Sequence, residues 1–185
     1  TGEILRQQSL SPSLFAEGVA SFSDVLIQIT WKEGRAMVYD RSSWKLLHLF
    51  LYSGEGWGLC RDGDTLWMSN GSATLTQRDR HTFAILKTLR VTLNNKPVAR
   101  LNDLECCKDY LYANVWLTDW IIRIDKDSGI VTALIDASSL LSPEDKACLG
   151  PEEVLNGIAF HPQRGTFFLT GKNWPWIFEV RLALR

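Results

Sequence analysis

Several features that would assign a function at once are missing from this sequence of 185 residues. No apolar run approaches the roughly 20 residues that cross a bilayer as a helix. The formal net charge is only −1, so no excess of positive charge points to nucleic acid or to an anionic membrane surface. The three histidines, His48, His81 and His161, share no repeat position, which argues against a histidine-based metal site or triad. We therefore expect neither a nucleic-acid nor a membrane partner.

Cysteine is present, but no two cysteines form a Cys-x-x-Cys pair. The four are Cys60, Cys106, Cys107 and Cys148. Cys60 and Cys107 each lie five residues after one of the repeat openings described next, so we expect them at equivalent places in adjacent repeats. We predict buried thiols. A disulfide that involves Cys148 stays open for an oxidising compartment, because spacing alone does not settle the pairing.

A short pattern returns four times along the chain: Glu or Asn with a small or acidic neighbour opens a strand, and a second strand ends about a dozen residues later. The openings are Glu17-Gly18-Val19-Ala20, Glu55-Gly56-Trp57-Gly58, Asn102-Asp103-Leu104-Glu105 and Asn156-Gly157-Ile158-Ala159. The matching strand ends are Trp31, Asn70, Trp116 and Lys172. Successive openings lie 38, 47 and 54 residues apart. A period near 40–50 residues in a strand-rich chain indicates a β-propeller in which each repeat is one blade.

The strands within each repeat complete this picture. In the first repeat we predict strands over 25–31, 35–40 and 44–50, separated by turn signals. The third strand ends in Asp40, Asp79 or Asp125, where an aspartate commonly caps the turn. The fourth repeat ends with its third strand, 176–184, while 2–10 reads as a strand without a blade; pairing the two would cover an exposed edge. The prediction is an all-β propeller domain over 1–185 with four blades of four-stranded antiparallel sheets.

One segment, 136–153, interrupts the strand pattern. Ser142 followed by Pro143 suggests an N-cap and a proline at the first helical position. Gly150 and Pro151 would end such a helix. We predict one short helix near 142–149, between the third and fourth blades.

Six stretches of the chain resemble glutaminyl cyclotransferases of the plant and bacterial type, which are five-bladed propellers. The stretches are Thr30-Trp31-Lys32-Glu33-Gly34, Gly54-Glu55-Gly56-Trp57-Gly58-Leu59, Leu101-Asn102-Asp103-Leu104-Glu105, Tyr112-Ala113-Asn114-Val115-Trp116, Val154-Leu155-Asn156-Gly157-Ile158-Ala159 and Thr170-Gly171-Lys172. The resemblance implies an aminoacyltransferase that converts the N-terminal glutamine of a peptide into pyroglutamate and releases ammonia. It also implies peptide or protein partners with N-terminal glutamine, no cofactor, and a secreted or periplasmic location.

The beginning of the chain departs from the family pattern. Family members start with a further blade that carries a Phe-Thr-Gln-Gly-Leu stretch, whereas Phe15-Ala16-Glu17-Gly18 resembles their second blade. The resemblance thus aligns this chain with blades two to five, either as a fragment of a five-bladed enzyme or as a protein that closes with four blades. Because the Phe and Gln that the first blade adds to the pocket have no counterpart here, we expect an impaired activity.

The resemblance also nominates site residues. Glu17 matches the family's catalytic carboxylate, Asn102 and Lys172 match its polar site residues, and the substrate-binding aromatic residues are matched by Phe15, Trp31, Trp57 and Trp116. A glutamate suits proton transfer near neutral pH if an apolar aromatic pocket raises its pKa. We expect no metal among the catalytic groups, although a structural divalent cation on the propeller axis stays open.

Two other functions fit the repeats. A metal-dependent propeller hydrolase of the gluconolactonase kind places oxygen ligands around an axial divalent cation, and a ring of Glu17, Glu55, Asn102 and Asn156 could supply them. A non-catalytic binding propeller would use the same positions only to hold blades together. Glu55, Asn70 and Asn156 have no role assigned by the resemblance.

Overall fold

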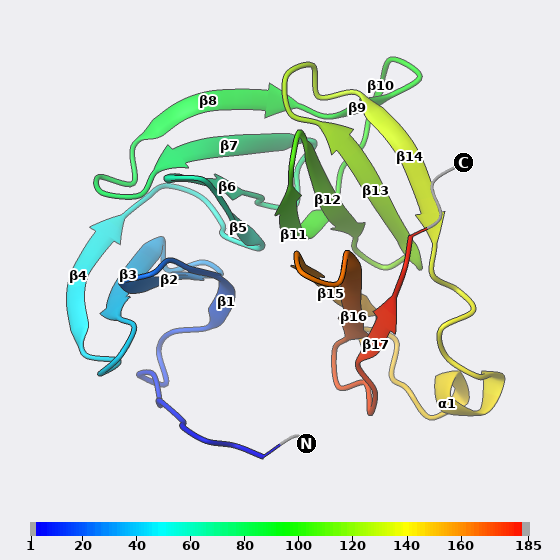
Figure 1. Cartoon of the computed structure of the whole chain (residues 1–185), viewed down its shortest axis with the longest axis horizontal. Helices are drawn as coiled ribbons and strands as arrows, with labels where there is room; N and C mark the ends of the chain where they lie inside the picture. The colour runs from blue at the N-terminus through cyan, green and yellow to red at the C-terminus, as the bar shows by residue number, and fades with distance from the viewer. Residues whose placement is uncertain (1–2, 183–185) are drawn as a thin grey trace.

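The computed structural model describes residues 3–182, in which four antiparallel sheets follow one another around a common centre (Figure 1). Each sheet pairs its strands in sequence order. The first blade contains β1 (Ala16–Ser21), β2 (Val25–Thr30), β3 (Arg35–Asp40) and β4 (Leu46–Leu51). The second contains β5 (Leu59–Asp62), β6 (Thr65–Met68), β7 (Thr74–Asp79) and β8 (Ile85–Arg90), and the third β11 (Leu101–Cys107), β12 (Tyr110–Val115), β13 (Trp120–Asp125) and β14 (Val131–Asp136). The predicted four-bladed propeller is confirmed.

Two short elements lie between blades. A hairpin of β9 (Thr92–Leu93) and β10 (Lys96–Pro97) connects the second blade to the third. The helix α1 (Pro143–Ala147) precedes the fourth blade, and its N-cap Ser142 accepts a hydrogen bond at Oγ from the backbone N–H of Asp145 at 3.1 Å. The predicted helix is therefore confirmed at its cap and at its proline. The described residues contain no helix that is long and apolar enough to cross a membrane.

The fourth blade differs from the prediction. Its strands are β15 (Leu155–His161), β16 (Thr166–Gly171) and β17 (Phe178–Val180), and no fourth strand joins them within residues 3–182. Residues 3–10, expected to supply it, form no strand; the rest of the expected segments, at 2 and at 183–184, falls outside the described residues. Instead, Arg6 Nη1 donates to the carbonyl of Ser42 at 2.7 Å, which holds this segment against the first blade.

The same turn joins the third and fourth strands in three blades. Oδ1 of Asp40, Asp79 and Asp125 accepts a backbone N–H from the residue three positions later at 2.7–2.8 Å, as expected for aspartate caps. The fourth residue after each aspartate is left-handed: φ is 60° at Trp44, 59° at Phe83 and 73° at Gly129. Because this conformation interrupts the strand, β4 begins at residue 46 and not at 44 as predicted.

Adjacent blades stack through apolar faces, so the second strands of the second and third blades, β6 and β12, are buried on both sides. Leu66 packs toward the first blade and Trp67 toward the third; Leu111 packs toward the second and Tyr112 toward the fourth. Successive side chains of a strand point to opposite faces of its sheet, which explains this alternation. The second strands therefore read as nearly continuous apolar runs.

The first strand of each blade lies at the centre (Figure 1), and hairpin register shows which positions are equivalent. Residues paired at the same place in the four hairpins are Val19 with Gln28, Leu59 with Met68, Leu104 with Ala113, and Ile158 with Leu169. Two positions earlier stand Glu17, Trp57, Asn102 and Asn156. The predicted equivalence of Glu55 with Glu17 is therefore wrong by two residues. At the position that follows the second strand, the residue equivalent to Trp31, Trp116 and Lys172 is Gly71 and not Asn70.

Close backbone approach at the centre explains this error. A Cβ atom on Gly18 would stand 2.5 Å from the backbone N of Leu59, and one on Gly58 would stand 2.8 Å from Cα of Asp103. Glycine at these two positions lets neighbouring first strands come together. The Glu-Gly dipeptide occurs at both Glu17-Gly18 and Glu55-Gly56, so the sequence suggests that these two pairs are equivalent. In the structure, however, the residue equivalent to Gly18 is Gly58.

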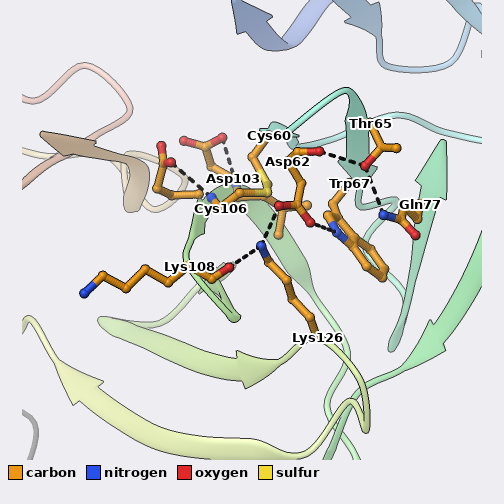
Figure 2. Close-up of a disulfide and its surroundings, with 11 residues drawn as sticks. Cys60, Asp62, Thr65, Trp67, Gln77, Asp103, Cys106, Lys108 and Lys126 are labelled. Carbon is orange, nitrogen blue, oxygen red and sulfur yellow. Dashed lines mark hydrogen bonds and ion pairs between the residues drawn. A yellow bond between two sulfur atoms is a disulfide. The ribbon is translucent and has the colours of Figure 1, made fainter. Parts of the chain in front are cut away.

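A disulfide between Cys60 and Cys106 ties β5 to β11, at the junction of the second and third blades (Figure 2). Beside it, Lys126 Nζ forms an ion pair with Asp62 Oδ1 at 2.7 Å, also between these blades. The prediction of buried thiols is wrong for the bonded pair: by hairpin register Cys60 corresponds to Glu105, not to Cys107, and it faces Cys106 of the next strand. Cys107 is free and half-buried, and Cys148 is free and exposed, so the prediction of buried thiols is wrong for these two as well.

We expect replacement of Cys60 and Cys106 by alanine to lower the free energy of unfolding, because the bond closes a loop with a sequence separation of 46 residues. Loop-closure entropy gives an effect on the order of 4 kcal/mol. Urea denaturation measures it, with Cys148→Ala as the matched control. Finding four reactive thiols in the untreated protein after denaturation would contradict the bond.

Candidate active site

All seven residues nominated from the sequence line one pocket of about 290 Å³ at one end of the inner strands. They are Phe15, Glu17, Trp31, Trp57, Asn102, Trp116 and Lys172, and Glu152 joins them as an eighth. Their distant positions converge because antiparallel first and second strands bring the start of one and the end of the other to the same edge. Phe15 and Trp31, for example, are joined by a backbone hydrogen bond of 3.0 Å.

Every blade contributes to this pocket. Glu17 comes from the first blade, Trp57 from the second and Asn102 from the third, all at the equivalent position near the start of the first strand. Trp31, Trp116 and Lys172 follow the second strands of the first, third and fourth blades. The second blade has Gly71 at this position, with φ of +78°, and a Cβ there would lie 2.6 Å from the Trp57 ring. The absence of a side chain at Gly71 therefore makes room for the Trp57 indole.

Aromatic side chains form the pocket wall in two edge-to-face pairs. The Phe15 and Trp31 ring centroids lie 5.9 Å apart, and those of Trp57 and Trp116 lie 5.3 Å apart. Lys172 Nζ stands 6.0 Å from the centroid of the Trp116 ring, at the outer limit of a cation–π contact. The wall is thus apolar, with a cation at its rim.

Glu17 has the electrostatics of a proton-transfer group. Burial raises the pKa of its carboxyl to about 7, because the surrounding protein disfavours the charged form. The charge of Lys172 lowers this pKa and that of Asp103 raises it, with burial the largest of the three effects. Near neutral pH both protonation states of Glu17 are therefore populated, as an acid that also acts as a base requires.

The polar side-chain groups in the pocket are available to a ligand. Among the described residues, no hydrogen bond or ion pair engages the side chain of Glu17, Asn102 or Lys172; Asn102 takes part only through its carbonyl, which accepts from Ser69 Oγ at 2.7 Å. Asn102 is 5% exposed. An acid or base, an amide and an ammonium group thus surround a single small volume.

Sequence reasoning missed three acidic residues in and behind the pocket. Asp103 accepts hydrogen bonds from the backbone N–H groups of Leu104 and Ile158, both at 3.0 Å, yet burial raises its pKa to about 6. Burial likewise raises the pKa of Glu105 to about 7. Asp103 and Glu105 both belong to the motif Leu101-Asn102-Asp103-Leu104-Glu105, so this motif could have indicated them as site residues. Glu152 lies outside the repeats, where no pattern could indicate it.

A larger cavity of about 820 Å³ runs along the inner strands behind the pocket and shares Glu17, Trp57 and Asn102 with it. Asp103, Glu105 and Asn156 line it as well. The ring of oxygen ligands considered for a divalent cation is not assembled there, because Glu55 accepts hydrogen bonds from two indoles and Asn156 Oδ1 accepts from the Asp103 backbone at 3.3 Å. In residues 3–182 no group of three or more His, Cys, Asp or Glu side chains could hold a metal ion.

Comparison with known proteins identifies a match over nearly the whole chain. A family model described as glutamine cyclotransferase matches residues 1–182. A glutaminyl-peptide cyclotransferase of Arabidopsis thaliana is 32% identical over 183 residues, which is 98% of this chain. The chain spans 57% of the length of that relative.

Solved structures agree with the sequence match. The glutaminyl cyclase of Myxococcus xanthus superposes with a TM-score of 0.88 and 40% identity, covering 94% of this chain and 75% of the other. The computationally designed protein Ika4 superposes with a TM-score of 0.54 at 14% identity, covering 96% of this chain and all of the other. The first likeness extends to sequence, whereas the second concerns the fold alone.

We expect Glu17→Gln to change how stability depends on pH. Between about pH 4.5 and pH 7 the folded chain keeps a proton on Glu17 that the unfolded chain has released, so this site favours folding at low pH and its contribution is lost as the pH rises through 7. Urea midpoints from pH 4.5 to pH 8 should therefore fall more steeply with pH in the wild type than in the variant. Parallel curves would show that the pKa of Glu17 is not raised.

Proposed function

We propose that this chain, which belongs to the glutamine cyclotransferase family, converts the N-terminal glutamine of peptides into pyroglutamate and releases ammonia. One observation carries the proposal: Glu17, Asn102, Lys172 and three tryptophans, all nominated by motif, line one pocket. The partners would be peptides or proteins whose first residue is glutamine.

The proposed reaction joins two ends of the same residue. The neutral α-amine attacks the side-chain amide carbon, a C–N bond forms, and the bond from that carbon to the amide nitrogen breaks as ammonia leaves. One proton moves from the attacking nitrogen to the leaving nitrogen. A carboxyl with a pKa of about 7 can accept this proton and return it, which is the role we assign to Glu17.

The other polar groups would stabilise charge and position. Attack turns the amide carbonyl oxygen into an oxyanion, and donors fixed near it lower the barrier. Lys172 and Asn102 supply such donors at the pocket, and the tryptophan wall would hold the glutamine side chain folded toward its own amine, the geometry that ring closure needs. Every group in this scheme is a side chain of the protein, and no cofactor takes part in it.

The proposed location is secreted or periplasmic. The Cys60–Cys106 bond supports it, because disulfides persist in oxidising compartments and are rare in reducing ones.

We expect Glu17→Gln to lower kcat for a glutamine-initiated peptide by about 10²-fold or more, since the amide cannot accept and return the proton. The measurement is ammonia release coupled to the mass loss of the peptide, with the exposed surface residue Glu144 changed to Gln as the matched control. A variant that cyclises the peptide at the wild-type rate would remove Glu17 from the mechanism. Turnover that a chelator abolishes and calcium restores would instead favour the metal-dependent alternative.

A further inference from the structure

We propose that Glu55 is a positioning residue that fixes the tryptophan wall of the pocket, a role that rests on the function proposed above. Its carboxylate oxygen Oε2 accepts the indole N–H of Trp31 at 2.8 Å and that of Trp57 at 2.9 Å. Trp31 belongs to the first blade and Trp57 to the second, so a single oxygen atom bridges two blades.

A carboxylate suits this place chemically. An indole N–H can only donate, and a partly buried donor needs an acceptor. Two donors that converge on one point need an acceptor with at least two lone pairs, and an ionised carboxylate makes stronger bonds than a neutral group. The two indoles and the nearby Lys32 lower the pKa of Glu55, in contrast to the raised pKa of Glu17, so Glu55 stays charged while Glu17 titrates.

The effect of this bridge extends around the wall. Trp57 packs edge to face with Trp116, whose own Nε1 is buried without a hydrogen-bond partner in the described residues. The Trp116 ring is therefore oriented by packing against Trp57 and not by a bond of its own. Trp31 packs in the same manner against Phe15. Glu55 thus anchors two rings directly and two through them.

Glu55 does not itself line the pocket of about 290 Å³. It would act on the reaction only through the orientation of the indoles, which distinguishes it from Glu17, Asn102 and Lys172. Small displacements of positioning groups reduce the share of bound substrate in attack geometry, so the loss should appear mainly in kcat.

The test compares Glu55→Ala with Glu55→Gln, which keeps an acceptor oxygen and removes the charge. With a glutamine-initiated peptide we expect Glu55→Ala to lower kcat by about 10- to 100-fold. KM should change less than kcat, and Glu55→Gln should recover most of the lost rate. Glu144→Ala, on the surface helix, is the matched control and should behave as the wild type. A Glu55→Gln variant as slow as Glu55→Ala, or a Glu55→Ala variant at the wild-type rate, would overturn the proposal.

A second readout does not depend on turnover. Near-UV circular dichroism and acrylamide quenching of tryptophan should change in Glu55→Ala and not in Glu55→Gln. In a Trp57→Phe background, which lacks one of the two donors, Glu55→Ala should change these signals less than it does alone. Equal changes in both backgrounds would show that Glu55 does not act through Trp57.

The two readouts separate this inference from the function it rests on. If the wild type fails to cyclise any glutamine-initiated peptide while the spectra change as described, the proposed function fails and the anchoring role of Glu55 stands. If the wild type cyclises the peptide and neither spectra nor rate respond to Glu55→Ala, the function stands and the anchoring role fails.

Discussion

The close approach of the first strands at the centre is the constraint on which the rest of the structure depends. Gly18 and Gly58 let the backbones of neighbouring blades come within contact distance, so β1 lies against β5 and β5 against β11. The first strands begin at the same end of the propeller, and residues from four separate blades can therefore line one pocket.

Electrostatic contrast within a small region follows from this geometry. Glu17 faces an apolar wall and loses hydration, so its carboxyl keeps a proton to about pH 7. Glu55 accepts two indole N–H groups of the same wall, and it remains charged. Two glutamates close to the same tryptophans thus have opposite properties, because burial dominates at Glu17 and indole hydrogen bonds dominate at Glu55.

Much of the fold could be predicted from the sequence, because the turns and the helix cap depend on residues close together in the chain. The aspartate turns at Asp40, Asp79 and Asp125 and the Ser142 cap each depend on bonds within a few residues. The seven pocket residues were found through motifs. The predictions that failed depend on neighbours far along the chain: the pairing of Cys60 with Cys106, the hydrogen bond from Trp31 to Glu55, and the equivalence of Trp57 with Glu17. Each is decided by contacts between blades, and composition alone contains no information about them.

The register equivalence has a meaning for the history of such a fold. Glu17, Trp57, Asn102 and Asn156 hold one position in four copies of the same unit, yet they are an acid, an aromatic ring and two amides. If the blades arose by duplication, the copies began with identical groups at this position, and a ring of identical groups cannot hold an asymmetric molecule in a single orientation. Divergence at a single repeated position broke that symmetry while the glycines that set the spacing could stay. One repeated position thus carries the chemistry of the pocket, while the glycines Gly18 and Gly58 carry the backbone spacing.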